Sequence, residues 1–512
     1  MKKQINQIKA GVVLSYVNLA LGTLIPVFYT PIMLRMLGQS GHGLYALANS
    51  AVGYLSLLSF GFGSTIFRYF SKYRAENDVE SIRRTYGFFL KLYLGLMLVV
   101  MAGGAALMYF APMLFDCKLS ESELDTLRYL IPVLSMHTAI TFPLSIFNSL
   151  IMSHERYLFR RIMDILGTIL VPVCNLVALH LGYASIGLAA SGFLMELVMS
   201  IPCIIYCTRV LGYTPTFKPV PKALVREMVG FSGYVFLSSI ADAFFWSTDK
   251  VILGMLLGSI AVSVYQVGGM FNGMVMQLSA AISNVLIPRI TGMIVKNASS
   301  EELADLFIRV GRVQYLIVAL IVSGFVGFGM PFVQMWAGDG YRDAYLITIL
   351  TLAPLCVPLI QSTGDQILLA QNKHKFRSLV YLAIAVANVI STWLIVPYMG
   401  GIGAALCSCV SYLLGQGFIM NLYYYKVIHI NIPHFWKEIG AMSVVPVGLL
   451  LLTLLVQKFY PIRNWITFFA GVFLYTILYC IGMYHLGMND YEKNLIRKPV
   501  GRILSKLSRK TI

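Results

Sequence analysis

The chain has 512 residues, of which 58% are hydrophobic and only 12% are charged, whereas a soluble domain carries about 25% charged residues. Apolar stretches recur along the whole sequence, each long enough to cross a hydrocarbon layer as a helix of about 20 residues. A soluble globular protein is therefore excluded. Because backbone polar groups inside a bilayer must be satisfied within the chain, we expect an all-α polytopic membrane protein.

The apolar segments predict about fourteen membrane-spanning helices joined by short loops. With the N-terminus inside, the inner segments hold 32 of the 39 Lys and Arg residues, and the excess holds loop by loop. This asymmetry is the positive-inside rule, so we expect both termini in the cytoplasm. In chain order the predicted spans are 10–34, 44–67, 86–111, 129–152, 162–182, 184–208, 231–255, 262–287, 313–334, 344–369, 376–397, 401–425, 440–457 and 464–487.

The same distribution explains the formal net charge of +17. Basic inner loops face the anionic head groups of membrane lipids, so no nucleic acid is expected as a partner. Seven of the eight cysteines fall inside spans, where a thiol usually packs as a small apolar group. We find no metal-ligand pattern and no nucleotide-binding loop of the GxxxxGK[ST] type, and the longest outer loop, 112–128, is too short for a catalytic domain. The sequence thus predicts a protein with no cofactor, no metal and no enzymatic activity.

The two halves of the chain repeat one another. Leu37-Gly38 is followed by Tyr45, and Leu257-Gly258 is followed by Tyr265 at the same spacing. Six spans separate the copies, and this even number predicts two parallel six-helix lobes related by an axis along the membrane normal. We therefore expect an N-terminal lobe (1–215), a C-terminal lobe (216–430), two extra helices (431–490) and a basic cytoplasmic tail (491–512).

Several ordered motifs resemble those of a known family. The runs Leu34–Gly38, Gly43–Leu47, Gly61–Ser64 and Arg68–Ser71 resemble the N-terminal signature of bacterial polysaccharide flippases of the O-antigen or capsule type. Asp249-Lys250 with the glycines that follow it resembles the seventh helix of that family. The family belongs to the multidrug/oligosaccharidyl-lipid/polysaccharide exporter superfamily, and the resemblance covers nearly the whole chain.

The resemblance implies a fold like that of the multidrug (MATE) exporters in a bacterial cytoplasmic (inner) membrane, with alternating access to a central cavity. The implied substrate is an undecaprenyl-diphosphate oligosaccharide, turned from the cytoplasmic to the outer leaflet for cell-surface polysaccharides such as lipopolysaccharide. A polysaccharide polymerase is a possible partner, and H⁺ or Na⁺ a possible coupling ion. In related lipid II flippases, two extra helices form a groove for the lipid tail, which we carry over to spans thirteen and fourteen.

Ionisable residues inside spans are the main site candidates, because each is costly to place in a bilayer. Asp242 and Asp249 lie seven residues apart in span seven, with Phe245 and Trp246 between them on nearly the same face. We interpret these four as a cavity-lining stripe for a coupling cation or sugar hydroxyls; acids paired with a neighbouring helix for packing are the alternative. Lys250 could pair with a diphosphate or extend to the outer interface.

Other candidates have stronger structural alternatives. Glu196, near the centre of span six, joins Asp242 as an ion-coupling candidate. Asp365, with Gln361 one turn away, could line the substrate path or lie at the inner interface. Arg68, Lys91 and Arg289 are candidates for a cytoplasmic mouth, although membrane topology alone accounts for basic residues at inner span ends.

Two further functions remain open at this point. A cation-coupled multidrug exporter of the same superfamily would share the two six-helix lobes but usually has twelve spans. A membrane-embedded polysaccharide polymerase would need a larger outer loop or acids at the membrane surface, whereas the strongest acids here lie within the spans.

Overall fold

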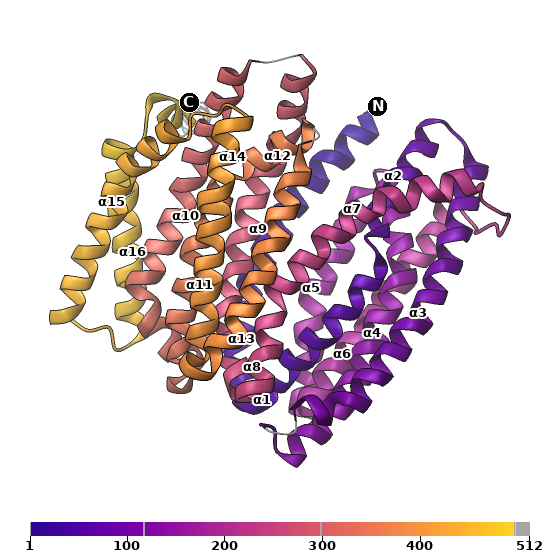
Figure 1. Ribbon diagram of the computed structural model, residues 1–512, viewed down its shortest axis with the longest axis horizontal. Helices are drawn as coiled ribbons and strands as arrows, with labels where there is room; N and C mark the ends of the chain where they lie inside the picture. The colour runs from indigo at the N-terminus through magenta and orange to yellow at the C-terminus, as the bar shows by residue number, and fades with distance from the viewer. Residues whose placement is uncertain (1, 116–117, 297–298, 372, 496, 498–512) are drawn as a thin grey trace, which may run out of the picture. The chain divides into compact units, whose positions relative to one another are not determined.

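The computed structural model describes residues 2–115, 118–296, 299–371, 373–495 and 497, and these residues form helices and short connections without any strand (Figure 1). The long helices are α1 (Lys2–Gly53), α2 (Phe62–Ala75), α3 (Val79–Phe115), α4 (Glu121–Ser153), α5 (Tyr157–His180), α6 (Ala184–Ile205), α7 (Lys222–Trp246), α8 (Thr248–Leu257), α9 (Ser259–Val295), α10 (Ser300–Ala337), α11 (Asp343–Ile360), α12 (Ser362–Ala370), α13 (His374–Tyr412), α14 (Met420–Val427), α15 (Ile432–Phe459) and α16 (Trp465–Gly482). Short helical turns are η1 (Tyr54–Ser59), η2 (Tyr206–Val210), η3 (Asp339–Tyr341), η4 (Leu413–Ile419) and η5 (Met483–Gly487).

Eleven described segments are long and apolar enough to cross a membrane. Two of them, Val13–Ala75 and Lys375–Val427, each contain a glycine with non-helical backbone angles, Gly38 and Gly400, and so each contain two spans. As one straight helix, the first of these segments would extend about 95 Å, roughly three times the hydrocarbon thickness. With α9, which matches the eighth predicted span, these segments account for the fourteen expected spans. The all-α polytopic fold is confirmed.

Glycines make the turns after the first and seventh spans, in backbone conformations that other residues adopt only with strain. Gly38 has φ 71° and ψ 172°, and Gly258 has φ 90° and ψ −173°. An L side chain is strained in this region of backbone space, which is nearly exclusive to glycine. Gly38 and Gly258 are the two positions that the repeat aligns, so the same turn follows the first and the seventh spans.

The helices group into two compact units, and each is described by itself. The first contains residues 1–267 and 381–407, and the second contains 268–380 and 408–512. The core of the first unit is rich in aromatic residues from α2, α3 and α4, including Phe70, Phe89 and Tyr93. The second has a core around Phe307 and Phe435. The predicted lobe boundary at 215 stays a prediction, and 498–512 of the expected tail lies outside the described residues.

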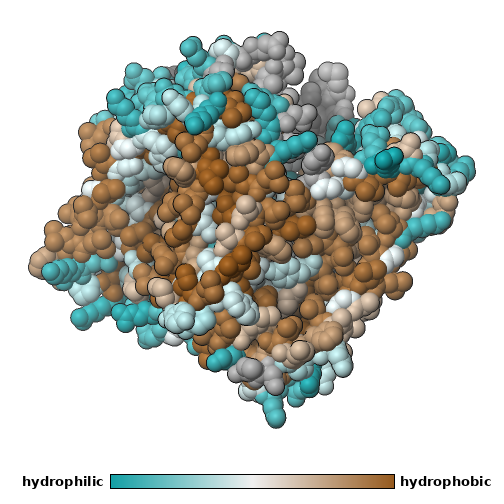
Figure 2. Space-filling model, in the orientation of Figure 1, coloured by the Kyte–Doolittle hydropathy of each residue, from teal (hydrophilic) through white to brown (hydrophobic). Residues whose placement is uncertain are grey.

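Large apolar side chains also cover the outside of the helices. Tyr398 is 88% exposed and Met113 is 84% exposed, and Figure 2 shows hydrophobic side chains along the middle of the visible helices, with hydrophilic ones toward their ends. Exposed apolar surface on this scale is unfavourable in water and favourable in lipid. The surface therefore matches a multi-pass membrane protein.

Candidate functional site

The seventh span consists of two helices. α7 ends at Trp246 and α8 begins at Thr248, with Ser247 between them at φ −111°. The amide of Ser247 still donates to the carbonyl of Ala243 at 3.0 Å, so the helix bends there while keeping that hydrogen bond. Discontinuous membrane helices supply binding groups in many transporters. Here the break places Asp249 in the first turn of α8, where a negative charge is favoured by the helix dipole.

Asp249 is 1% exposed and accepts hydrogen bonds from neutral side chains. Its Oδ2 accepts a hydrogen bond from the Tyr265 hydroxyl of α9 at 2.6 Å. Its Oδ1 accepts from Thr392 Oγ1 at 3.2 Å and from Asn388 Nδ2 at 3.4 Å, both on α13. Three donors offset part of the cost of burying the acid. Because these four side chains all carry oxygen atoms, the arrangement could also bind a hard cation.

Asp242 lies seven residues before Asp249 and faces the same helix, α13. Its Oδ1 accepts from the Tyr381 hydroxyl at 3.1 Å. Tyr381 is likewise seven residues before Asn388, so α7–α8 and α13 run side by side in the same direction along this row. Asp242 is exposed, unlike Asp249. The two acids therefore differ in environment although they share one side of the span.

The aromatic candidates lie beside the same row. The rings of Phe245 and Tyr381 stack with centroids 6.0 Å apart and an interplanar angle of 18°. Trp246 contacts Phe245 edge-on at 6.0 Å. Phe245 is buried, whereas Trp246 is half-buried. Sugar stacking at either ring stays a prediction.

Lys250 is half-buried and donates to Gln266 Oε1 of α9 at 2.9 Å. It is held within the span by this contact, next to Asp249 in sequence. Nearby, the buried His42 Nδ1 lies 2.8 Å from Ser263 Oγ. A diphosphate-binding role for Lys250 stays a prediction.

Sequence reasoning missed the partners of both acids. In the sequence Tyr265 stands out only as part of the repeat, and no pattern considered above singles out Tyr381, Asn388 or Thr392. The last two are polar residues four apart in an apolar span, so they share a helix face. That pattern is the available signal, but nothing in the sequence indicates that this face meets Asp249.

The predicted cytoplasmic mouth residues have separate surroundings. The Arg68 guanidinium of α2 lies 4.6 Å from the ring centroid of Phe231 on α7, next to a buried hydrogen bond of 2.6 Å between Thr65 and Ser232. Lys91 on α3 lies 4.8 Å from the ring centroid of Phe217. The side chain of Arg289 lies outside the described residues. Arg68 and Lys91 thus contact different aromatic residues, and a role at a cytoplasmic mouth stays a prediction.

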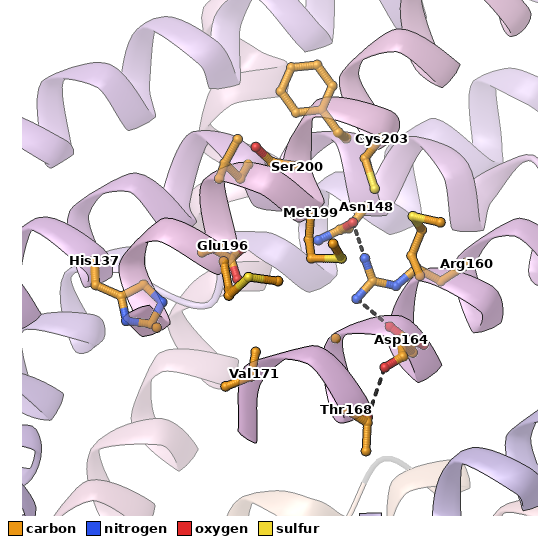
Figure 3. A pocket seen from close by; sticks show the side chains of 16 residues that line it. His137, Asn148, Arg160, Asp164, Thr168, Val171, Glu196, Met199, Ser200 and Cys203 are labelled. Carbon is orange, nitrogen blue, oxygen red and sulfur yellow. Dashed lines mark hydrogen bonds and ion pairs between the residues drawn. The ribbon is translucent and has the colours of Figure 1, made fainter. Parts of the chain in front are cut away.

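Glu196 lines a pocket of about 280 Å³ between α4, α5 and α6, which has both apolar and charged side chains in its walls (Figure 3). In this view Glu196 lies between His137 and the ion pair of Arg160 with Asp164, whose Nη2–Oδ1 distance is 2.8 Å. Arg160 also donates to Asn148, and Arg161 pairs with Asp164 at 3.0 Å. Asp164 is therefore accounted for by its two arginines. Glu196 is near the middle of α6, as expected, and its coupling role stays a prediction.

Asp365 and Gln361 belong to the second unit. Asp365 Oδ1 pairs with Arg377 Nε at 2.6 Å and accepts from the Tyr424 hydroxyl at 3.1 Å. Gln361 lies at the break between α11 and α12, is 2% exposed, and donates to Asn421 Oδ1 at 2.7 Å. Internal contacts therefore explain both residues, and a substrate role for them stays a prediction.

The two extra helices enclose an apolar groove of about 550 Å³. Its walls come from α15 and α16, including Leu452, Ala470 and Leu474, with Arg463 at one end. Gln457 donates to the carbonyl of Gly327 at 2.9 Å and so ties α15 to α10. The groove has the size and polarity for a hydrocarbon chain rather than for a sugar.

Together these features define a helical multi-pass membrane protein with the fold of known transporters. The solved structure of the lipid II flippase MurJ in an inward closed conformation superposes with a TM-score of 0.72 at 14% identity, covering 96% of this chain and 99% of that chain. An inward-facing multidrug resistance transporter of the MATE family gives a TM-score of 0.60, also at 14% identity, over 82% of this chain and 99% of that chain. At this identity the similarity shows the fold alone.

The chain belongs to the polysaccharide biosynthesis protein family, whose model matches residues 8–294, more than half of the 512. A relative in Bacillus subtilis, the uncharacterized membrane protein EpsK, is 20% identical over 93% of this chain and 95% of its own. A protein of Shigella flexneri named as an O-antigen transporter is 21% identical over 79% of this chain and 94% of its own. These matches confirm the family resemblance seen in the sequence.

Proposed function

We propose that the protein is a flippase that moves an undecaprenyl-diphosphate oligosaccharide from the cytoplasmic to the outer leaflet by alternating access. The observation that carries this proposal is a buried carboxylate, Asp249, within a membrane span of a chain from the polysaccharide biosynthesis family. The relative named as an O-antigen transporter supports a transport function. The MurJ-like fold supports a lipid-linked substrate.

The internal repeat supports a function for Asp249 beyond packing. The position 220 residues earlier is Tyr29, whose hydroxyl accepts from Asn175 Nδ2 at 3.0 Å. Asn175 is in the fifth span, and Asn388 is in the eleventh span, its counterpart in the repeat. The first half of the chain thus fills this position with a neutral pair, so the fold itself does not require an acid there. We infer that Asp249 binds the coupling ion, H⁺ or Na⁺, with Glu196 as a second ion site.

The remaining assignments follow the path of the substrate. Lys250 offsets diphosphate charge, and the α15–α16 groove holds the polyprenyl chain. Arg68, Lys91 and Arg289 attract the charged head group at the cytoplasmic side. The distribution of basic residues supports cytoplasmic termini, and the relatives in Bacillus subtilis and Shigella flexneri support a bacterial inner membrane as the location.

The test is reconstitution of the purified protein in vesicles with a fluorescent undecaprenyl-diphosphate oligosaccharide. Wild-type protein is expected to move label between leaflets, faster under an imposed Na⁺ or pH gradient. Asp249→Asn is expected to abolish the response to the gradient and to lower the rate at least 10-fold. A 10-fold decrease corresponds to the loss of about 1.4 kcal/mol of transition-state stabilisation. Asp343→Asn, an exposed acid at the start of α11, is the matched control and is expected to behave like wild type.

A cation-coupled multidrug exporter is the second candidate, favoured by the similarity to a MATE transporter. The same vesicles distinguish the two. Extrusion of a cationic dye against its gradient, with no movement of the labelled lipid, would replace the flippase with the exporter.

A further inference from the structure

The first unit has one end that is predicted to face outside the cell. At this end the carboxylate of Glu123 accepts hydrogen bonds from residues of three turns. Glu123 Oε1 accepts hydrogen bonds from Ser40 Oγ and from Ser259 Oγ, each at 2.5 Å. Ser40 follows Gly38 in the turn after the first span, and Ser259 follows Gly258 in the turn after the seventh. The two serines therefore come from corresponding turns of the internal repeat, more than 200 residues apart in sequence.

Glu123 is held in place by its own helix. Its Oε2 accepts from the backbone amide of Ser120 at 2.9 Å, and Ser120 caps the start of α4 in a capping box. Burial disfavours ionisation of Glu123, but hydrogen bonds from Ser259, Ser40 and Ser120 outweigh burial and hold the pKa of its carboxyl below the usual value. The acceptor is therefore a fixed, charged group, which makes shorter and stronger hydrogen bonds than a neutral one.

The chain segments joined by Glu123 are in direct contact. A Cβ atom on Gly43 would lie 1.9 Å from the carbonyl oxygen of Ser259, and one on Gly254 would lie 2.5 Å from the Leu47 side chain. At Gly43 only glycine permits this approach, because the opposing atoms belong to the Ser259 backbone; at Gly254 the Leu47 side chain fills the space between the segments. The two segments therefore pack directly against each other at this end of the unit.

We propose that Glu123 is a latch that keeps the outer ends of α1 and α9 together, and that its release is a step of the transport cycle. The inference rests on the proposed function, because alternating access requires a closed outer end that can open. Hydroxyl donors suit such a latch, because the hydroxyl groups of Ser40 and Ser259 can form hydrogen bonds with water when the turns separate. An apolar contact has no hydrogen bond that fixes the direction of contact and that water can replace when the turns separate.

The test measures distance and does not depend on transport. Spin labels at Gln39→Cys and Ile260→Cys, with all native cysteines replaced, report the separation of the two turns in lipid nanodiscs, by dipolar line broadening at short range and by double electron–electron resonance at longer range. The latched protein is expected to give a dominant short distance and a minor population at a longer one. Ser259→Ala, which leaves the capping box intact, is expected to raise a longer-distance population at least three-fold, and Glu123→Ala more.

Asp125→Asn is the matched control, because Asp125 lies on the same helix turn in an exposed pair with Arg128 at 2.9 Å. It is expected to leave the distance distribution as in wild type. A distribution unchanged by both Ser259→Ala and Glu123→Ala, or changed equally by Asp125→Asn, would overturn the latch. If the variants open the turns but wild-type vesicles move no lipid, the latch stands and the flippase proposal fails.

Discussion

Gly38 and Gly258 adopt nearly the same left-handed, extended backbone conformation, at φ 71°, ψ 172° and φ 90°, ψ −173° respectively. The two residues lie 220 positions apart and follow the first and seventh spans. The repeat is therefore visible in the backbone conformation of these two glycines. A residue with a side chain would raise the free energy of this conformation by about 1–3 kcal/mol.

Alanine at these glycines is expected to destabilise the protein to different extents. Gly38→Ala should cost about 1–3 kcal/mol from backbone strain alone, because nothing lies within 4 Å of its Cβ position. Gly258→Ala should cost more, since its Cβ would lie 2.8 Å from the Lys118 carbonyl oxygen. Chemical unfolding in detergent measures both. Gly22→Ala, within α1 and without neighbours at its Cβ, is the control and should be neutral or slightly stabilising; equal losses in all three would contradict the backbone argument.

Among single charged residues of the second unit, replacement of Arg312 is expected to destabilise the protein most. It is 4% exposed and pairs with the buried Glu492 at 2.6 Å and with Glu438, and it donates to the Gly487 carbonyl at 2.9 Å. Arg312→Met leaves Glu492 buried without its counter-ion, which should cost about 3–5 kcal/mol. Thermal unfolding by intrinsic fluorescence measures the loss.

The control for Arg312 lies one turn earlier on the same helix. Arg309 pairs with Asp305 at 2.5 Å, with both side chains about half exposed at 46% and 56%. Arg309→Met should therefore cost only about 0–1 kcal/mol. A loss as large as that for Arg312→Met would show that burial does not decide the difference.

The segment 211–221 between α6 and α7 is expected to detach when Gly87 gains a side chain. Its Thr216 amide donates to the Arg83 carbonyl at 3.0 Å, and a Cβ on Gly87 would lie 2.2 Å from the Thr216 carbonyl oxygen. Gly87→Ala should raise the rate of chymotryptic cleavage after Phe217, in the same segment, several-fold. Gly95→Ala, two turns along α3 with nothing within 4 Å, should leave the cleavage rate as in wild type. No acceleration with Gly87→Ala would mean that the segment is not held by α3.

Filling the α15–α16 groove is expected to slow transport of long-chain substrates. Ala470→Trp places a large ring among the groove residues, whereas Phe473→Trp changes a lipid-exposed position outside it. The first should lower the rate for an undecaprenyl substrate several-fold while sparing a short-chain analogue, because only the long chain needs the apolar groove. Vesicle assays with both substrates provide the comparison. If Ala470→Trp slows transport of both substrates equally, the groove does not bind the polyprenyl chain.

The spans and their turns were predictable from the sequence because each depends on local features. Hydropathy over about 20 residues determines whether a segment crosses a bilayer, and a glycine such as Gly38 permits a turn by its own backbone freedom. The repeat could be read for the same reason. Breaks within spans were less visible: Ser247 and Gln361 are ordinary residues, and their backbone angles depend on what packs against them.

Partners of the buried charges were decided only by the tertiary structure. Asp249 was identified as an acid in a span, but Asn388 is 139 residues away, and Glu492 is 180 residues from Arg312. Side chains this distant meet only when helices pack, and their types alone do not specify the pairing. The sequence by itself determined a fourteen-span membrane protein and where its costly charges lie; helix packing decided which of them are buried, which donors surround them, and that Glu123 joins the two repeated turns.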